Sequence, residues 1–286
     1  MKTKNKVTIL LPTYDRYTTT LPLCLMSIVN QSYLPDRVVL IDDSPQKRFY
    51  EHETLKNILY LFKQYGIEFD YFYGESKGVV PALQIGLDNI EDGWVLKMDD
   101  DNILPYNTIE LFVKNIKPNI GAMGGVVVDH FFIKYQKNNP DKISTEIDGY
   151  YNRIENIYTE LNIQMMVEQS PEIKQVQHLY SNYFFNRKLA DDYPMELQPS
   201  GHREETIFTY SIFRKGYDII VIPQIKMQHL SFDDNTGDKQ YKDKRKNEEY
   251  FIERLKEWGI IPDKIKPVEK EGKLVLERNG MIFKVL

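Results

Sequence analysis

The strongest constraint on the fold is a series of short apolar runs, each followed at once by polar residues or by a proline. These runs are residues 7–11, 37–41, 68–73 and 94–98. Runs that are largely apolar, without strict alternation, predict strands covered on both faces, as in the parallel sheets of α/β proteins. Helical spacing of apolar residues between the runs predicts connecting helices. Residues from about 5 to about 105 are therefore predicted to form a doubly wound, mostly parallel sheet.

Composition places the chain among globular proteins of ordinary charge. Its 286 residues include 37 Lys and Arg against 42 Asp and Glu, which gives a formal charge of −5, and 42% are hydrophobic. This balance supports a sizeable core and gives no overall attraction to nucleic acid phosphates. Cys24 is the only cysteine, which excludes an internal disulfide and a cysteine-based metal site. No apolar run approaches the length of a membrane span, so we expect no transmembrane segment and a cytoplasmic location.

The second half of the sequence is less regular. Strands are predicted at 121–128 and 218–222, and a helix at about 203–215. Further on, a charged amphipathic helix is predicted at 239–258. An Asn-Gly turn between alternating runs predicts a terminal hairpin over 273–286. The chain is therefore expected to end in a helix and a hairpin outside the first sheet.

Polar residues gather where the predicted strands end. They are residues 12–16, 42–43, 74–78 and 99–101. The carboxyl ends of parallel strands meet at one edge of a sheet, where folds of this kind bind their ligands. The sequence therefore predicts one polar ligand site at this edge.

Three consecutive aspartates, Asp99, Asp100 and Asp101, follow the predicted strand at 94–98. Their mutual repulsion costs stability unless a cation or solvent screens it, and carboxylate oxygens suit Mg²⁺ or Mn²⁺. Such ions commonly keep substrate phosphates as further ligands, so one or two aspartates suffice. A solvated turn that opens a helix near Pro105 explains the same residues without a metal. These three residues alone leave both interpretations open.

Several segments, taken in order, resemble the nucleotide-sugar-binding motifs of the family 2 glycosyltransferases. They are residues 7–16, 38–44, 77–87 and 98–105, continued by 181–187, 203–206, 216–217 and His229. Each segment is a weak signal, but their order over about residues 5 to 230 is specific. The resemblance implies the GT-A fold, a Rossmann-like arrangement with an irregular acceptor-binding half.

The resemblance also assigns residues to the nucleotide sugar. Those implied to bind it are Pro12, Thr13, Tyr14, Asp15, Asp42, Lys77, Asp99, Asp100 and Asn182. Residues at the ends of the first two strands hold uracil or another base, on which Tyr14 stacks, and Lys77 lies beside the base and the phosphates. In the DXD motif Asp99 reaches the ribose and Asp101 binds the metal. A shift of one residue makes Asp100 the ribose contact instead.

Glu204 and Glu205 stand where the family has a Glu-Asp pair at the start of a helix, so the resemblance implies that Glu205 is the catalytic base. The longer side chain of Glu leaves Glu204 as an alternative base. Acidic residues in a first helical turn also complement the helix dipole, which explains one of the two without catalysis. His229 is implied to bind the metal or the diphosphate, with a structural role as the alternative.

Together these assignments predict an inverting glycosyltransferase that uses Mn²⁺ or Mg²⁺ and a nucleoside diphosphate sugar, with uridine favoured. The acceptor is a hydroxyl of a glycan, a lipid-linked sugar, a protein or a modified nucleic acid base. Residues 1–125 are expected to bind the nucleotide sugar, 126–235 to bind the acceptor and carry the base, and 236–286 to form the terminal helix and hairpin. A nucleotidyltransferase and a non-catalytic nucleotide-sugar or glycan-binding protein are the alternatives, although residues 12–17 lack the glycines of a nucleotidyltransferase loop.

Overall fold

The computed structural model describes residues 5–129, 172–179, 181–197, 201, 203–230 and 244–259, and three strands near the end of the chain. Within the predicted acceptor-binding segment, 126–235, residues 130–171 and 231–235 and a few single positions lie outside the described residues. The first residues of the helix predicted at 239–258 lie outside them as well. The following description concerns the described residues.

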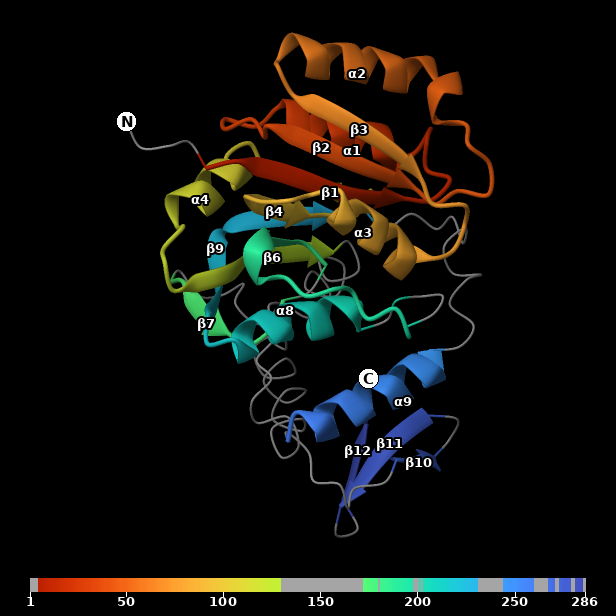
Figure 1. The fold of residues 1–286 in the computed structure, drawn as a ribbon, viewed down its shortest axis with the longest axis vertical. Coiled ribbons are helices and arrows are strands. Elements are labelled where there is room, and N and C mark those ends of the chain that lie inside the picture. Colours follow the sequence, from red (N-terminus) through yellow and green to blue (C-terminus); the bar gives the residue numbers. More distant parts are fainter. Residues whose placement is uncertain are drawn as a thin grey trace, which may run out of the picture.

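One large sheet runs through the molecule with the strand order β3-β2-β1-β4-β8-β6-β9-β5, and β7 pairs with β9 (Figure 1). The strands are β1 Val7–Thr13, β2 Arg37–Asp42, β3 Glu68–Tyr73, β4 Trp94–Lys97, β5 Asn102–Ile103, β6 Ile120–Asp129, β7 Lys174–Val176, β8 Tyr183–Asn186 and β9 Asp218–His229. Strands β1 to β4 pair in parallel, and β8 joins them antiparallel to β4 and β6. The parallel first half is confirmed, and antiparallel pairs enter only with the second half.

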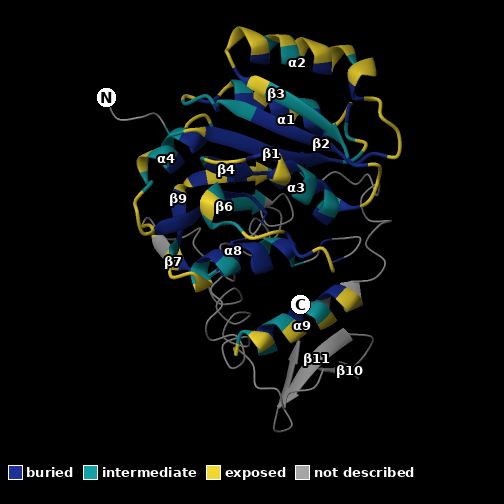
Figure 2. Cartoon of the chain, viewed as in Figure 1, coloured by how far each residue is buried: buried dark blue, intermediate teal, exposed yellow. Residues whose placement is uncertain are grey.

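Helices cover both faces of this sheet. They are α1 Thr20–Val29, α2 Glu53–Gln64, α3 Val79–Asp88, α4 Thr108–Lys114, α8 Glu204–Arg214 and α9 Lys244–Glu257, with 3₁₀ turns η1 at Phe49–Glu51 and η3 at Arg187–Leu189. On β1, Ile9 and Leu11 belong to the hydrophobic cluster that includes α1, α2 and α4, whereas Leu10 belongs to the cluster that includes α3, α8 and α9. The buried strands thus lie between two helical layers (Figure 2). The doubly wound α/β architecture is therefore as predicted.

Two strands are longer than the sequence predicts, because each continues through a proline. The apolar runs predicted that the strands would end before Pro12 and Pro223, but β1 reaches Thr13 and β9 reaches His229. The pairing of β1 with β4 stops at Leu10, so Pro12 has no ladder bond to lose on that side. Pro223 lies where the β6–β9 register shifts, which leaves a missing N–H harmless. The extension of β9 carries His229 into the candidate site.

The end of the chain forms a second, three-stranded antiparallel sheet of β10 Pro267–Lys270, β11 Lys273–Arg278 and β12 Met281–Lys284. The predicted hairpin is present, since Arg278 pairs with Met281 across the turn. The sequence analysis did not predict β10 or α2. Within its described part, the predicted charged helix is present as α9.

Helix α9 shares a core with α8. Phe251, Ile252 and Leu255 are buried in the same cluster as the apolar face of α8. The ring centroids of Tyr210 and Trp258 lie 4.9 Å apart.

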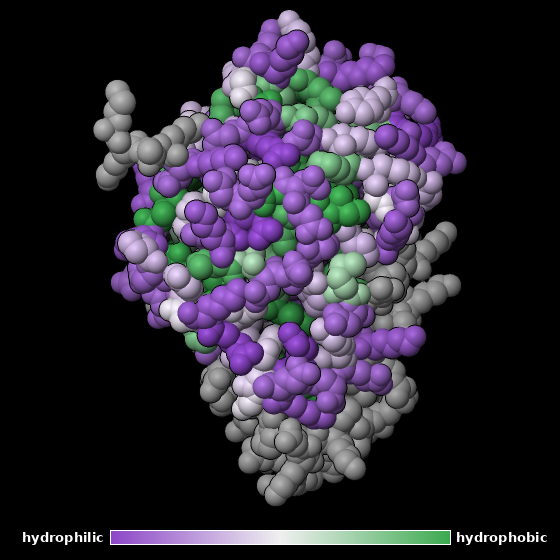
Figure 3. Space-filling model, viewed as in Figure 1, coloured by the Kyte–Doolittle hydropathy of each residue, from purple (hydrophilic) through white to green (hydrophobic). Residues whose placement is uncertain are grey.

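The surface shown in Figure 3 is mainly hydrophilic outside small apolar areas. Among the described helices, none combines the length and apolar character needed to cross a bilayer.

Candidate functional site

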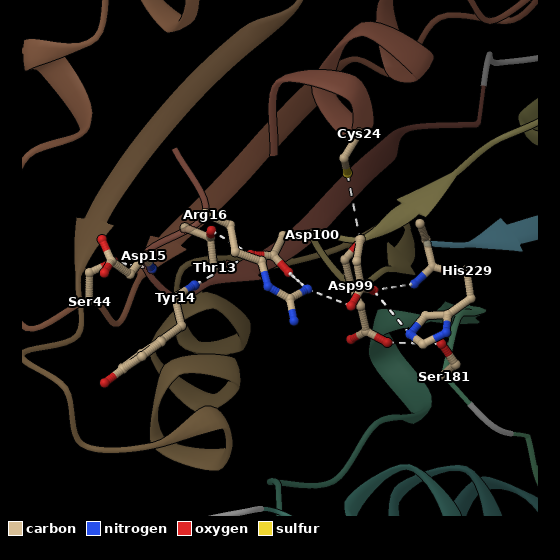
Figure 4. Close-up of polar contacts among 12 residues, drawn as sticks. Thr13, Tyr14, Asp15, Arg16, Cys24, Ser44, Asp99, Asp100, Ser181 and His229 are labelled. Atoms are coloured by element: carbon tan, nitrogen blue, oxygen red, sulfur yellow. Dashed lines mark hydrogen bonds and ion pairs between the residues drawn. The ribbon is translucent and has the colours of Figure 1, made fainter. Parts of the chain in front are cut away.

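The ends of β1, β2 and β4 are in direct contact at one edge of the sheet. The hydroxyl of Thr13, at the end of β1, donates to Asp100 Oδ2 after β4 at 2.6 Å. The backbone N–H of Asp15 donates to Ser44 Oγ after β2 at 2.8 Å (Figure 4). The polar strand ends therefore meet as parallel strand ends should.

Asp100 is held from the β1 side. Besides Thr13, Arg16 donates from Nη1 to Asp100 Oδ1 at 2.9 Å, and the backbone N–H of Tyr14 lies 3.4 Å from Oδ2. Only 7% of Asp100 is exposed. Burial, together with repulsion from Asp101, raises the pKa of Asp100 to about 7, although Arg16 acts in the opposite direction. Asp100 thus lies at the edge formed by the predicted base-binding residues.

Asp101 lies between the β1 loop and the far end of β9. Arg16 Nη1 forms an ion pair with Asp101 Oδ2, and His229 Nε2 lies 3.4 Å from Oδ1. Strand β5 pairs antiparallel with β9 so that Asn102 is opposite His229, which fixes the imidazole beside the carboxylate. Burial alone would raise the pKa of Asp101, but the hydrogen bond with His229 and the charges of His229 and Arg16 prevail and lower it.

This arrangement fits a divalent cation. Carboxylate and imidazole are suitable donors for Mn²⁺, and Asp101 with His229 supplies one of each. Among the described residues, no cluster of three or more His, Cys, Asp or Glu side chains forms a closed metal cage. An ion held by so few protein ligands leaves positions for phosphate oxygens, as is usual for Mg²⁺ and Mn²⁺ at nucleotide sites. The pair Asp101 and His229 therefore remains the predicted metal site.

Asp99 faces a different set of neighbours from the other two aspartates. Its Oδ1 lies 2.7 Å from Lys97 Nζ, and its Oδ2 accepts the Ser181 hydroxyl at 2.8 Å. Its backbone N–H donates to Asn182 Oδ1 at 3.1 Å, and Asn182 has no exposed surface. The neighbours of Asp99 thus favour the shifted register, in which Asp100 and Asp101 face the donor side.

Lys97 is a buried cation at the end of β4, with 1% of the residue exposed. In addition to Asp99, its Nζ donates to the Ser181 carbonyl at 2.9 Å. Burial opposes protonation of this amine, but the three surrounding carboxylates outweigh burial and raise the pKa of Lys97. Two of those carboxylates are Glu204 and Glu205. Lys97 therefore links the aspartate turn electrostatically to helix α8.

Glu204 and Glu205 occupy the first turn of α8 and share a hydrogen bond. Burial and the neighbouring carboxylate raise the pKa of Glu204. Burial acts in the same direction on Glu205, but the hydrogen bond from Glu204 and the charge of Lys97 prevail and lower its pKa. The backbone N–H of Ser181 also donates to Glu205. The two carboxyl groups therefore have pKa values displaced in opposite directions, with that of Glu204 raised and that of the half-buried Glu205 lowered.

Two adjacent aspartates at the end of β2, Asp42 and Asp43, have different hydrogen-bond partners. Asp42 has no exposed surface, and its carboxylate accepts from Tyr17 at 2.8 Å, from Tyr71 at 2.7 Å and from the Ser44 hydroxyl. Asp43 accepts the backbone N–H groups of residues 77 and 78 at 2.9 and 2.8 Å. Asp42 therefore joins three segments behind the edge, and its predicted contact with the base stays a prediction.

The remaining predicted donor residues differ in exposure. Asp15 and Lys77 are exposed, Tyr14 is half-buried and Pro12 is buried within β1. Asp15 has a φ of 51°, a left-handed conformation that Asp tolerates better than most residues, and Lys77 pairs with Glu75 at 2.8 Å. Their side chains lie at the same edge as Thr13, but the structure gives them no contact that assigns a role.

Several residues that contact this site or interact with it electrostatically were not assigned from the sequence, among them Arg16, Lys97 and His178. Arg16 follows the predicted base-binding residues, so an arginine in that segment was the signal for it. Lys97 carried a signal too, as a lysine within an apolar strand. His178, which interacts electrostatically with Glu205, carried none, because its partners come from helix α8 and are distant in sequence.

Comparison with known proteins identifies this fold and its family. Three solved structures resemble the chain at 14% identity: GalNAc-T7 with UDP, GalNAc and Mn²⁺, the mannosyltransferase PcManGT from Pyrobaculum calidifontis with GDP-Man and Mn²⁺, and S. aureus TarS 1–349 with UDP-GlcNAc. Their TM-scores are 0.55, 0.57 and 0.51. The alignments cover 81, 89 and 80% of this chain but only 45, 64 and 60% of theirs. Comparison with curated proteins gives no significant sequence match.

The structural likeness confirms the GT-A fold that the sequence motifs implied. The sequence signature of glycosyl transferase family 2 matches residues 8–185, which include the strand ends, the aspartate turn and β8. This match extends over more than half of the 286 residues. The chain therefore belongs to glycosyl transferase family 2.

Proposed function

We propose that the chain is an inverting, metal-dependent glycosyltransferase that moves a sugar from a nucleoside diphosphate to a hydroxyl acceptor. The observation that carries this proposal is the linkage between the aspartate turn and α8. Ser181 donates its hydroxyl to Asp99 and its backbone N–H to Glu205, so one residue connects the donor edge to the candidate base. The family match and the nucleotide-bound relatives support the same class of reaction.

In this proposal the donor lies across the ends of β1, β2 and β4, with Asp100 at the ribose. Asp101 and His229 hold Mn²⁺ or Mg²⁺, which supplies Lewis-acid stabilisation of the diphosphate leaving group when bound. Uridine diphosphate sugars are the first donors to test, and residues 126–235 supply the acceptor site. Residues 1–125 form the donor-binding half in this proposal. Residues 236–286 form a terminal unit, whose helix α9 packs on α8.

Glu205 acts as the general base. It is ionised because Glu204 holds the shared proton and Lys97 lies nearby, so it accepts the proton of the acceptor hydroxyl as the new bond forms. Attack from the face opposite the diphosphate inverts the anomeric carbon. Glu204 keeps its proton and orients Glu205 through their hydrogen bond.

The two glutamates give a matched pair of variants. Glu205→Gln should lower kcat by about 10² to 10⁴, the usual size of a general-base contribution, with little change in donor affinity. Glu204→Gln resembles the protonated side chain in shape and charge, and should retain most of the activity. Turnover of UDP-sugars and GDP-mannose in Mn²⁺ is the measurement, with water as the acceptor until a better one is identified.

Two outcomes contradict this proposal. Near-normal turnover in both variants removes the base from the mechanism, and a loss confined to Glu204→Gln transfers the role to Glu204. The inverting course is tested separately by proton NMR of the sugar released from an α-linked donor. The first product observed should be the β-anomer, before mutarotation mixes the two. An α-anomer as the first product would refute inversion.

A further inference from the structure

The guanidinium of Arg16 contacts two of the three consecutive aspartates, Asp100 and Asp101. A single nitrogen, Nη1, is 2.9 Å from Asp100 Oδ1 and forms a second ion pair with Asp101 Oδ2. The side chains of Asp100 and Asp101 are only 9 and 11% exposed, and that of Arg16 is 23% exposed. One cationic atom thus bridges two adjacent, buried carboxylates.

This bridge answers an electrostatic need. Two adjacent carboxylates with little access to water repel each other, and burial penalises both charges. A cation that contacts both relieves the repulsion and provides hydrogen bonds that water does not supply. A divalent ion bound by Asp101 would relieve the same repulsion. Arg16 and the divalent ion would therefore compete for the carboxylate of Asp101.

Other cations near the turn do not share this position. Lys97 pairs with Asp99, the aspartate that faces Ser181 and α8. His229 contacts Asp101 from the β9 side, through the other carboxylate oxygen, Oδ1. An ion held by both Asp101 and His229 would replace the contact between Nε2 and Oδ1, and it would also have to share or replace the contact that Arg16 makes with Oδ2.

We propose that Arg16 is the resident counter-cation of Asp100 and Asp101, that it competes with the divalent metal for Asp101, and that the guanidinium released by the metal then binds the diphosphate of the donor. This inference rests on the proposed metal-dependent function. Arginine suits the second position because its planar fork of donors matches phosphate oxygens. Metal and nucleotide should then bind with positive coupling, because the nucleotide compensates the displaced guanidinium.

The first test measures Mn²⁺ affinity without nucleotide. The full chain is titrated with Mn²⁺, and the EPR signal of the free ion is the readout. Arg16→Gln removes the competitor, so it should bind Mn²⁺ about tenfold more tightly than wild type, since one charged hydrogen bond no longer has to be broken. Arg37→Gln is the matched control. Arg37 is also a half-buried arginine in an ion pair, with Asp70 on β3, but it lies at the start of β2, the opposite end of the strand from the candidate site. It should leave Mn²⁺ affinity unchanged.

The second test is UDP affinity in saturating Mn²⁺, measured by calorimetry. Here Arg16→Gln should bind about tenfold more weakly than wild type, because the diphosphate loses its guanidinium partner. The same substitution thus strengthens one ligand and weakens the other. A variant that is merely less stable would weaken both, so the opposite signs identify the exchange.

Each outcome decides the inference. Unchanged or weaker Mn²⁺ binding by Arg16→Gln, with wild type binding Mn²⁺ in the presence of UDP, overturns the role of Arg16 and leaves the proposed function intact. A wild-type protein that binds no Mn²⁺ with or without UDP overturns both. If Arg16→Gln does not fold, Arg16→Lys decides, because a lysine ammonium is a compact charge without the fork. It should also bind Mn²⁺ more tightly than wild type, by a smaller factor, and equal or weaker binding overturns the inference.

Discussion

At the scale of single residues, the candidate site is a set of buried charges whose protonation states are fixed by neighbours. The surrounding carboxylates raise the pKa of Lys97, burial and the adjacent carboxylate raise the pKa of Glu204, and the hydrogen bond from Glu204 and the charge of Lys97 lower the pKa of Glu205. His178 is the opposite case, because its imidazole is 4% exposed and Nδ1 has no hydrogen-bond partner among the described residues. Burial and then the charge of Arg203 lower the pKa of His178 to about 4.

This shift predicts a pH dependence of stability. Between about pH 6.5 and about pH 4 the unfolded chain binds a proton on His178 that the folded chain does not, so folding loses stability as the pH falls through this window. Relative to His178→Gln, the free energy of unfolding of wild type should decrease by about 3 kcal/mol across the window. Chemical denaturation of both proteins at several pH values measures the difference. A difference that is constant with pH would mean that the imidazole is not held neutral.

At the scale of elements, Asp42 connects the end of β2 to its surroundings. Its carboxylate accepts the hydroxyls of Tyr17, from the loop after β1, and of Tyr71, from β3. The Ser44 hydroxyl and backbone N–H also donate to it. Loss of the carboxylate therefore leaves several buried donors without an acceptor, which costs more than the loss of an exposed pair.

Asp42→Ala should lower the free energy of unfolding by about 3 kcal/mol, since at least two hydroxyls lose their partner. Asp70→Ala is the control, because Asp70 is 41% exposed and pairs with Arg37 at the sheet edge; about 0–1 kcal/mol is expected there. Denaturant unfolding gives both values. Unchanged stability together with weaker UDP binding would instead support the contact with the base that the family resemblance implied.

The elements that could be predicted from the sequence are those specified by local patterns. Parallel strands, α1, α3 and the order of strand ends follow from apolar runs and from helical spacing over few residues. The ends of β1 and β9 did not follow, because a proline stops a strand only where a neighbour needs its N–H, and neighbours are set by the sheet. Likewise, Asp101 and Glu205 could be predicted as site residues because they belong to sequence motifs. The position of His178 and the different partners of the three aspartates could not be predicted, because they depend on tertiary contacts.

At the scale of the whole molecule, ligand binding should stabilise the folded chain. A ligand that binds only the folded state at 100 times its Kd adds about 2.7 kcal/mol, which corresponds to a rise in Tm of roughly 4–5 °C for a chain of this size. We expect UDP with Mn²⁺ to produce such a rise. Asp101→Asn should lose the part that depends on Mn²⁺, because it removes a carboxylate ligand while the fold is retained.

Differential scanning calorimetry with UDP alone and with UDP plus Mn²⁺ separates the two contributions. Asp92→Asn is a suitable control, since the Asp92 side chain is 54% exposed and pairs with Lys6 at 3.3 Å. It should respond to the ligands as wild type does. An Mn²⁺-dependent rise of the same size in Asp101→Asn would remove Asp101 from the metal site.

The pairing of Asn102 with His229 also ties together the two backbone segments that carry the candidate metal ligands. The backbone N–H of Leu230 donates to the carbonyl of Asp101 at 2.7 Å, directly beside the β5–β9 ladder. Amide protons held in this way exchange with solvent only when the ladder opens, so protection at residue 230 reports the free energy of opening the pair. The backbones that carry the carboxylate and the imidazole can therefore move apart only when this short ladder opens.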